Sequence, residues 1–178
     1  MPNLARQDQF VVLLEEHKKI LFKVASSYCR SSADRDDLVQ EMILQLWRSF
    51  DRYDDRQRFS TWMYRVSLNV AISFYRREAP RSRATVPADD SIFDIAATAT
   101  DVVMLDDELR MLQRFIEQLD ELDRALVILY LDGNRHDTIA EVLGISESNV
   151  GTKISRIKQR IRREWGNHST KEHTHGAR

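Results

Sequence analysis

A break between two short amphipathic segments lies within residues 135–165, RHDTIAEVLGISESNVGTKISRIKQRIRREW. Apolar residues recur at helical spacing in IAEVL, directly before Gly144, and glycine readily adopts the positive φ that ends many helices. Ser146 follows two residues later, and a serine hydroxyl can cap the first turn of a new helix. The pattern therefore predicts a helix, a tight turn and a second helix.

The second of these helices has two chemically different sides. At about 100° per residue its large apolar residues share one sector, which must face a core. They are Val150, Ile154, Ile157, Ile161 and Trp165. The other side carries amide, hydroxyl and cationic groups, with no acid between Ser148 and Arg163. Such a face suits the major groove of DNA and its flanking phosphates. A solvated face is the alternative, although solvated faces usually mix charge signs.

Composition places the chain in the all-α class. Its 178 residues include only five glycines and three prolines, and 42% are apolar, which leaves few of the turn residues that an all-β fold requires. The single cysteine, Cys29, supplies neither an internal disulfide nor a C-x-x-C zinc-ligand pair. Histidines near the C-terminus have no thiolates or paired carboxylates beside them. We therefore expect no metal site and no cofactor.

Helical periodicity is interrupted once along the chain. Between Pro80 and Thr100, PRSRATVPADDSIFDIAATAT loses the period and contains two prolines. Helical patterning is found on either side of this stretch, over residues 9–29, 34–50, 60–78 and 106–165. We predict two small helical domains, a flexible linker and a disordered tail. The domains are predicted at residues 1–80 and 106–167, the linker at 81–105 and the tail at 168–178.

The charge of the chain is unevenly distributed. The formal net charge of -1 divides into +2 over residues 1–80, -2 over 81–105, -4 over 106–135 and +3 over 136–178. This asymmetry predicts two surfaces attracted to polyanions, separated by an acidic portion. No apolar run approaches the ~20 residues needed to cross a bilayer, and MPNLARQDQF lacks the apolar region of a signal peptide. We expect a cytoplasmic protein without membrane insertion.

Residues 58–77, RFSTWMYRVSLNVAISFYRR, combine aromatic side chains and arginines without an acid. On a helical wheel, two apolar stripes are predicted to be buried. The first stripe contains Met63, Val66, Val70 and Phe74, and the second contains Tyr64, Leu68, Ala71 and Tyr75. One narrow sector remains, and we expect it to be exposed as a nucleic-acid surface. It contains Trp62, Arg65, Asn69, Ser73 and Arg76.

The preceding helical segment has a core stripe of Leu38, Met42 and Leu46. Its other side is polar except for Leu44, and an apolar residue in a polar frame is a usual interface composition. Without further information, a solvated face with one stray leucine is the better interpretation of this pattern.

Two stretches together resemble the extracytoplasmic-function (ECF, group IV) sigma factors of the sigma-70 family. These stretches are ADRDDLVQEMILQLWRSFDRYDDRQRFSTWMYRVSLNVAISFYRRE and IAEVLGISESNVGTKISRIKQRIRR. The resemblance implies sigma region 2 in the first domain and sigma region 4 in the second. It further implies a subunit that binds core RNA polymerase, directs it to promoters and promotes DNA melting. The chain departs from the family pattern at Leu119-Asp120, where Asp120 can still cap a helix. It also departs at Arg135 and at Ser148-Asn149-Val150-Gly151, so a promoter sequence does not transfer.

The resemblance also assigns roles to three sets of residues. Recognition and melting of the minus-ten element fall to Ser60, Thr61, Trp62, Arg65, Asn69, Arg76 and Arg77, helped by the loop from Tyr53 to Ser60. Recognition of the minus-thirty-five element falls to Ser148, Asn149, Thr152, Lys153, Arg156 and Arg160. Docking on the largest-subunit clamp falls to Asp37, Gln40, Glu41, Leu44 and Arg48. The implied partners are promoter DNA, the polymerase clamp and flap, and an anti-sigma factor.

Two other classes of function were weighed against a sigma factor. A stand-alone regulator would bind duplex DNA through the second domain and dimerise through the first, but it needs neither DLVQE nor the sector around Asn69. An enzyme is not expected, because the chain lacks a phosphate-binding glycine loop, a nucleophile elbow and His-Glu-x-x-His. Asp36 and Asp37 lie in a charged run rather than in an apolar setting. Comigration with core polymerase distinguishes the first two classes.

Overall fold

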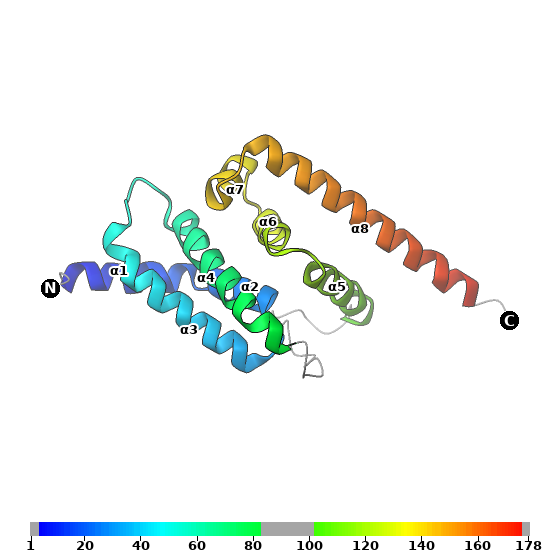
Figure 1. Ribbon diagram of the computed structural model, residues 1–178, viewed down its shortest axis with the longest axis horizontal. Coiled ribbons are helices and arrows are strands. Elements are labelled where there is room, and N and C mark those ends of the chain that lie inside the picture. Colours follow the sequence, from blue (N-terminus) through cyan, green and yellow to red (C-terminus); the bar gives the residue numbers. More distant parts are fainter. Residues whose placement is uncertain (1–3, 83–101, 176–178) are drawn as a thin grey trace. The chain divides into compact units, whose positions relative to one another are not determined.

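The computed structural model describes residues 4–82 and 102–175. Within those ranges it contains eight α-helices, one short 3-10 helix and no β-strand (Figure 1). The chain divides into two compact units, Met1–Gln113 and Arg114–Arg178. The predicted all-α class with two small helical domains is therefore confirmed.

The first unit is built around three packed helices, α2, α3 and α4 (Figure 1). Its elements are α1 (Leu4–His17), α2 (Lys19–Tyr28), α3 (Ser32–Ser49), the 3-10 helix η1 (Phe50–Arg52) and α4 (Phe59–Ser82). The periodic segment 9–29 is divided at Lys18, which keeps right-handed helical angles (φ -54°, ψ -27°). The apolar pattern consequently continues across a break that the sequence does not reveal.

The core of the first unit has an aliphatic part and an aromatic part. Val24, Leu38, Met42, Leu46 and Met63 are almost completely inaccessible to solvent, and burying a side chain of this size contributes roughly 1.5–3 kcal/mol. The aromatic part joins α1, η1 and the start of α4. It contains Phe10, Phe50, Tyr53, Phe59 and Trp62. The aromatic part thus lies next to the turn that leads into α4.

The second unit contains a helix-turn-helix, as predicted. It comprises the end of α5 (Val102–Glu117), then α6 (Glu121–Leu131), α7 (His136–Leu143) and α8 (Glu147–His175), and α6, α7 and α8 pack on one another. Gly144 ends α7 in the left-handed region (φ 67°, ψ 34°). The Ser146 hydroxyl accepts a hydrogen bond from the Asn149 amide at 3.2 Å. Both local predictions for this turn are confirmed.

Two side chains fix the connection between α5 and α6. The carboxylate of Asp120 caps α6 by accepting from the Asp123 amide at 2.8 Å, as the sequence predicted. Arg124 is buried and donates to the carbonyls of Ile116, Glu117 and Leu119 at 3.2, 2.7 and 3.3 Å. A cation that satisfies the last carbonyls of a helix stabilises that end. Arg124 therefore holds the end of α5 against α6.

The bounds of the linker and the tail differ from the sequence predictions. Helix α4 continues to Ser82, α5 begins at Val102, and the division between the units falls inside α5. Residues 83–101, the middle of the predicted linker, lie outside the described residues. Helix α8 continues through His175, although disorder was predicted from residue 168. Adding residues to an existing helix avoids the cost of nucleation, so α8 extends beyond its last apolar position.

Candidate nucleic-acid and protein interfaces

The exposed side of α4 forms a narrow polar strip. Asn69, Ser73, Arg76 and Arg77 are exposed and Arg65 is half-buried; these five residues are called the α4 face below. The strip is narrow because α4 packs against both α2 and α3, which bury much of its circumference. The Ser73 hydroxyl donates to the backbone carbonyl of Asn69 at 2.8 Å. The predicted exposure of Asn69, Ser73 and Arg76 is confirmed.

The predicted exposure of Trp62 is wrong. Its side chain is 8% exposed, and its ring lies 5.1 Å from Tyr53 and 5.4 Å from Phe59 between centroids. Thr61 is also buried, while Ser60 is half-buried. The wheel considered α4 alone, whereas η1 and the following loop fold back over its first turn. Trp62 therefore supports this part of the unit from inside and does not present an exposed stacking surface.

The loop between η1 and α4 is held by its own short-range contacts. The Tyr53 hydroxyl donates to the Gln57 carbonyl at 2.7 Å, and the Arg56 amide donates to the Asp54 carboxylate at 3.0 Å. Burial raises the pKa of the Tyr53 phenol, and the carboxylates of Asp55 and Asp54 raise it further. The phenol therefore remains a hydrogen-bond donor at neutral pH. Asp54, Asp55 and Arg56 are exposed around this ordered turn.

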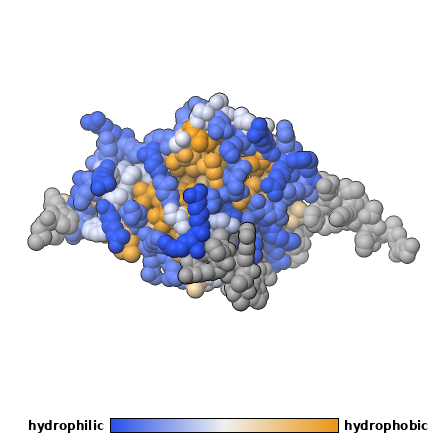
Figure 2. All heavy atoms as spheres, viewed as in Figure 1, coloured by the Kyte–Doolittle hydropathy of each residue, from blue (hydrophilic) through white to orange (hydrophobic). Residues whose placement is uncertain are grey.

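The outer side of α3 combines polar residues with exposed apolar ones. Leu44 is 53% exposed, which confirms the predicted exposure. On the side of the molecule seen in Figure 2, hydrophilic residues predominate and hydrophobic ones show among them. The other residues predicted for this surface are exposed or, for Glu41, half-buried. Together they form the α3 face: Asp37, Gln40, Glu41, Leu44 and Arg48.

Sequence reasoning missed Trp47, which is 39% exposed beside the α3 face. Its ring packs edge-on against Phe10, with centroids 5.1 Å apart. Trp47 follows Leu44 by three residues, so the same helical spacing identifies it. Neither the core stripe nor the polar side predicted from the sequence included Trp47.

The α3 and α4 faces are joined by an ion pair. The Arg77 guanidinium donates to the Glu41 carboxylate at 2.8 Å, and both side chains are about half exposed. The guanidinium also lies 5.2 Å from the centre of the Phe74 ring. Two residues predicted for different partners thus contact each other in the isolated chain.

The exposed side of α8 presents neutral polar groups near the start of the helix and a cation further along it. Ser148, Asn149, Thr152 and Arg156 are exposed as predicted, and they are called the α8 face. Gln159 is also exposed and lies near the middle of this face on the wheel. The residues predicted for this face from the sequence did not include it, although helical spacing alone identifies it.

Lys153 and Arg160 lie on the flank of α8 and contact the rest of the second unit. Lys153 donates to the Asp123 carboxylate at 2.6 Å, and both side chains are mostly buried. Arg160 donates to Glu164 at 3.1 Å and to Gln118 at 3.3 Å, and it lies over the Phe115 ring at 5.2 Å. Both cations therefore have partners inside the unit, with 24% of the Lys153 side chain and 39% of the Arg160 side chain exposed. Their contact with DNA stays a prediction.

The described residues offer no candidate for two other kinds of site. No three His, Cys, Asp or Glu side chains in that part of the chain gather as metal ligands. No helix in the same ranges has the length and apolar character required to span a membrane.

Two protein-family models match the chain in order. Sigma-70 region 2 matches residues 13–81 and Sigma-70, region 4 matches residues 109–161. The chain is 23% identical over 167 residues to the ECF RNA polymerase sigma factor SigW of Bacillus subtilis, covering 89% of each chain. It is 27% identical over 164 residues to the ECF RNA polymerase sigma-E factor of Escherichia coli, covering 87% of this chain and 85% of the relative.

Solved structures show the same fold. CnrH in complex with the cytosolic domain of CnrY is similar with a TM-score of 0.66 and 24% identity, covering 90% of each chain. The sigma factor RpoE of Bartonella quintana, in complex with the anti-sigma factor NepR, has a TM-score of 0.65 and 18% identity, covering 88% of this chain and 94% of RpoE. Because both sigma-70 models match and together span more than half of its length, the chain belongs to the ECF group of the sigma-70 family of RNA polymerase sigma factors.

Proposed function

We propose that this chain is a promoter-specificity subunit of RNA polymerase. It binds core polymerase in the bacterial cytoplasm, directs it to particular promoters and promotes opening of the DNA. The observation that carries this proposal is the ordered match of two sigma-70 regions to a chain that also presents three separate exposed faces. No catalytic step is assigned to it.

In this proposal the two domains have different duties. Residues 1–80 bind core polymerase and recognise and open the minus-ten element, and residues 106–167 recognise the minus-thirty-five element. Residues 81–105 connect them. The division of labour is supported by the match of region 2 to residues 13–81 and of region 4 to residues 109–161.

The α4 face and the neighbouring loop are proposed to hold the unpaired non-template strand. Cations bind phosphate, and Asn69 offers an exposed amide to a base or to the sugar-phosphate backbone. Stacking of an unpaired base contributes roughly 1–3 kcal/mol, which offsets the few kcal/mol needed to extract it from the duplex. Trp62 is not proposed as a stacking residue, because it is buried.

The α8 face is proposed to enter the major groove of the minus-thirty-five element. Asn149 and Thr152 present hydrogen-bonding groups near the start of the helix, and Arg156 follows one turn later. An exposed arginine can form two parallel hydrogen bonds to one guanine. Lys153 and Arg160 are proposed to orient α8 through their contacts with α6 and α5.

The α3 face is proposed to dock on the largest-subunit clamp, with the flap as a second polymerase contact of the chain. An anti-sigma factor is proposed as its regulator. Support for such a partner comes from RpoE, which was solved in complex with the anti-sigma factor NepR, and from the family resemblance. Trp47 extends the exposed apolar part of the α3 face.

Comigration with core polymerase on a sizing column tests the function directly. The full chain is expected to comigrate and to support transcription from a subset of fragmented genomic DNA. Alone it is expected to bind promoter duplex weakly at physiological salt, because its net charge is -1 and DNA attraction scales with the phosphates neutralised. Tight sequence-specific binding without polymerase would instead identify a stand-alone regulator.

The same assay tests the α3 face. Leu44→Asp is expected to weaken core binding at least tenfold, which corresponds to about 1.4 kcal/mol, with unchanged helical content and Tm because Leu44 lies off the core. Val12→Asp is the matched control, since Val12 is an apolar residue of the same unit with 57% exposure. Unfolding of Leu44→Asp, or equal losses in both variants, would remove the α3 face from the interface.

A further inference from the structure

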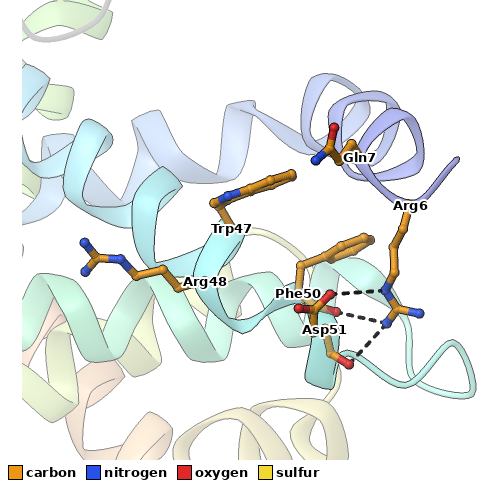
Figure 3. Close-up of a pocket in the computed structure, with 6 residues that line it drawn as sticks. All are labelled: Arg6, Gln7, Trp47, Arg48, Phe50 and Asp51. Carbon is orange, nitrogen blue, oxygen red and sulfur yellow. Dashed lines mark hydrogen bonds and ion pairs between the residues drawn. The ribbon is translucent and has the colours of Figure 1, made fainter. Parts of the chain in front are cut away.

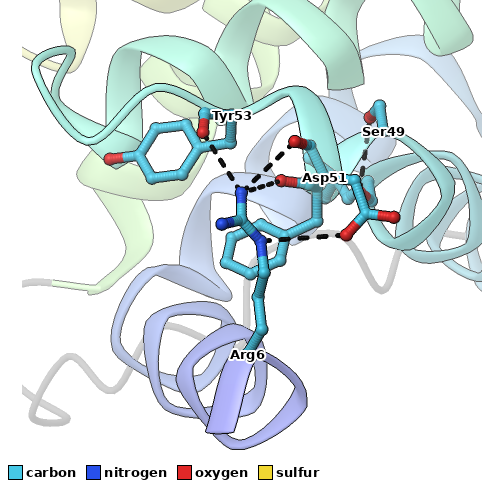
Figure 4. Close-up of polar contacts among 6 residues, drawn as sticks. Arg6, Ser49, Asp51 and Tyr53 are labelled. Atoms are coloured by element: carbon cyan, nitrogen blue, oxygen red, sulfur yellow. Dashed lines mark hydrogen bonds and ion pairs between the residues drawn. The ribbon is translucent and has the colours of Figure 1, made fainter. Parts of the chain in front are cut away.

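Arg6 on α1 reaches across the first unit to the turn that follows α3 (Figure 4). Its Nη2 atom donates to the backbone carbonyls of Phe50, Asp51 and Tyr53 at 3.1, 3.3 and 3.4 Å. These three acceptors are 44 to 47 residues away in sequence. One side chain therefore binds three carbonyls of the turn that leads into the loop before α4.

The last carbonyls of a helix have no partner within that helix, and they carry partial negative charge. In this turn the Phe50 carbonyl also accepts from the Tyr53 amide at 3.0 Å. The guanidinium is matched to such a site by its charge and by its several donors. Its carbon lies 5.4 Å from the centre of the Phe50 ring. Arg6 is thus a capping group supplied by a different helix.

The remaining polar contact of Arg6 is weaker. Its Nε atom is buried without a hydrogen-bond partner, and the Asp51 carboxylate lies 3.7 Å away, which is beyond ordinary hydrogen-bond length. Arg6 and Asp51 also border a cavity of about 150 Å³ between α1 and the end of α3 (Figure 3). The carbonyl contacts therefore account for most of the hold that Arg6 has on the turn.

Tyr53 transmits this hold to the loop. Its carbonyl accepts from Arg6, its ring stacks on Phe50 at 5.7 Å with an interplanar angle of 14°, and its hydroxyl donates to Gln57 at 2.7 Å. The backbone N–H of Gln57 in turn donates to the backbone carbonyl of Asp54 at 3.0 Å. The position of the loop consequently depends on the position of Tyr53.

We infer that Arg6 is a positioning residue for promoter opening. By fixing the turn from Phe50 to Tyr53, it holds the loop ahead of α4 in the shape that receives the unpaired base. A loop ordered in advance binds its ligand without the entropy cost of ordering it then. This inference rests on the proposed function, in which the loop and the α4 face capture the non-template strand.

Substitution of Arg6 tests the inference in reconstituted holoenzyme. Arg6→Met removes the donors and keeps an apolar stem beside Phe50, so it enlarges the cavity less than alanine would. Permanganate reactivity of unpaired thymines at saturating promoter is expected to fall roughly three- to tenfold, as the loss of charge-assisted hydrogen bonds implies. Core affinity and closed-complex affinity are expected to stay at wild-type values. Permanganate reactivity with Arg6→Lys is expected to lie between that of the wild type and that of Arg6→Met. An ammonium group keeps the positive charge but lacks the planar set of donors of a guanidinium.

Two controls separate positioning from simple stability. Lys18→Met removes another cation of the first unit, at the break between α1 and α2, whose partner is the exposed carboxylate of Glu15 at 2.7 Å. Val24→Ala truncates a fully buried side chain on α2, which supplies none of the loop contacts described above, and is expected to lower Tm at least as much as Arg6→Met. Both controls are expected to open the promoter normally at a temperature well below their Tm.

The outcomes distinguish this inference from the proposed function. Normal promoter opening by Arg6→Met holoenzyme would overturn the inference. The same holds if Arg6→Met reduces opening no more than Val24→Ala does, with each variant measured at the same interval below its own Tm. A wild-type chain that neither binds core polymerase nor opens promoter DNA would overturn the proposed function itself. Selective loss of opening in Arg6→Met, with partial recovery in Arg6→Lys, supports the positioning role.

Discussion

The α4 face and the α8 face are both narrow polar strips, but they rest on different supports. Beneath the start of α4 lies the aromatic part of the core, with Trp62 among Phe50, Tyr53 and Phe59. Beside α8, a polar contact is added to the aliphatic core of Val150, Ile154 and Ile157, since Lys153 is paired with Asp123. Aromatic packing resists displacement over a large area, whereas an ion pair fixes one point. Substitutions in the two supports should therefore lower stability by different amounts.

The largest difference is expected for Trp62→Ala. Truncation of a buried aromatic residue removes packing and leaves a cavity, which costs about 3–5 kcal/mol. Urea-induced unfolding followed by circular dichroism measures the loss. Asn69→Ala, on the exposed strip of the same helix, is the control and should change stability by less than about 0.5 kcal/mol. Unchanged stability in Trp62→Ala would indicate that Trp62 is exposed, and it would contradict the comparison between the two supports.

For α8, the comparison is sharpened by substituting an exposed cation and a flanking one. Arg156→Ala is expected to weaken holoenzyme binding to the minus-thirty-five element by about 1–3 kcal/mol, the cost of one two-bond base contact. Opening should survive once binding is saturated. Lys153→Met is expected to lower the stability of the second unit by roughly 1 kcal/mol, because it leaves Asp123 without its partner.

Binding titrations on duplexes with and without an altered minus-thirty-five element measure the first effect, and thermal melts measure the second. A Lys153→Met variant of full stability that binds as weakly as Arg156→Ala would indicate that Lys153 leaves Asp123 for the DNA. In that case the ion pair would be part of recognition.

Asn69→Ala tests the α4 face for function after Trp62→Ala has tested its support. Closed complexes should form normally, while opening should fall about fivefold, as expected for one lost hydrogen bond of roughly 1 kcal/mol. Permanganate footprinting measures unpaired thymines. Ser27→Ala is the matched control, because Ser27 lies on α2, outside the α4 face, and its hydroxyl donates to the backbone carbonyl of Lys23 one turn earlier at 2.8 Å. Normal thymine reactivity in Asn69→Ala holoenzyme would remove Asn69 from the melting site.

The sequence predicted local features well wherever neighbouring residues determine them. The left-handed Gly144, the caps at Asp120 and Ser146, and the exposed Leu44 follow from residue type and helical spacing alone. The break at Lys18 could not be predicted, because this residue stays helical and the apolar period continues across it.

Side chains that a second segment of the chain contacts were predicted poorly, for a common physical reason. A wheel describes one helix and its two sides, but the burial of Trp62 depends on η1 and on the loop that folds over α4. The position of Arg160 likewise depends on Phe115 and Gln118 of a different segment. The contact of Arg6 with carbonyls more than 40 residues away carries no local signal at all.

The smallest expected effect concerns the ion pair between the α3 and α4 faces. Glu41 and Arg77 are about half exposed, so their coupling in the isolated chain should amount to about 0.2–1 kcal/mol and should weaken as salt is added. A double-mutant cycle with Glu41→Gln and Arg77→Met isolates that coupling from the other contacts of Arg77, including Phe74. Urea-induced unfolding gives the value for the isolated chain.

The same cycle, measured as promoter affinity of the holoenzyme, is expected to give no coupling. If Glu41 turns to the polymerase clamp and Arg77 to phosphate, each residue acts on its own partner and the two effects add. A coupling that persists unchanged in holoenzyme would mean that the pair stays closed on the polymerase. The α3 and α4 faces would then share one structural contact, and neither Glu41 nor Arg77 would belong to the surfaces proposed for them.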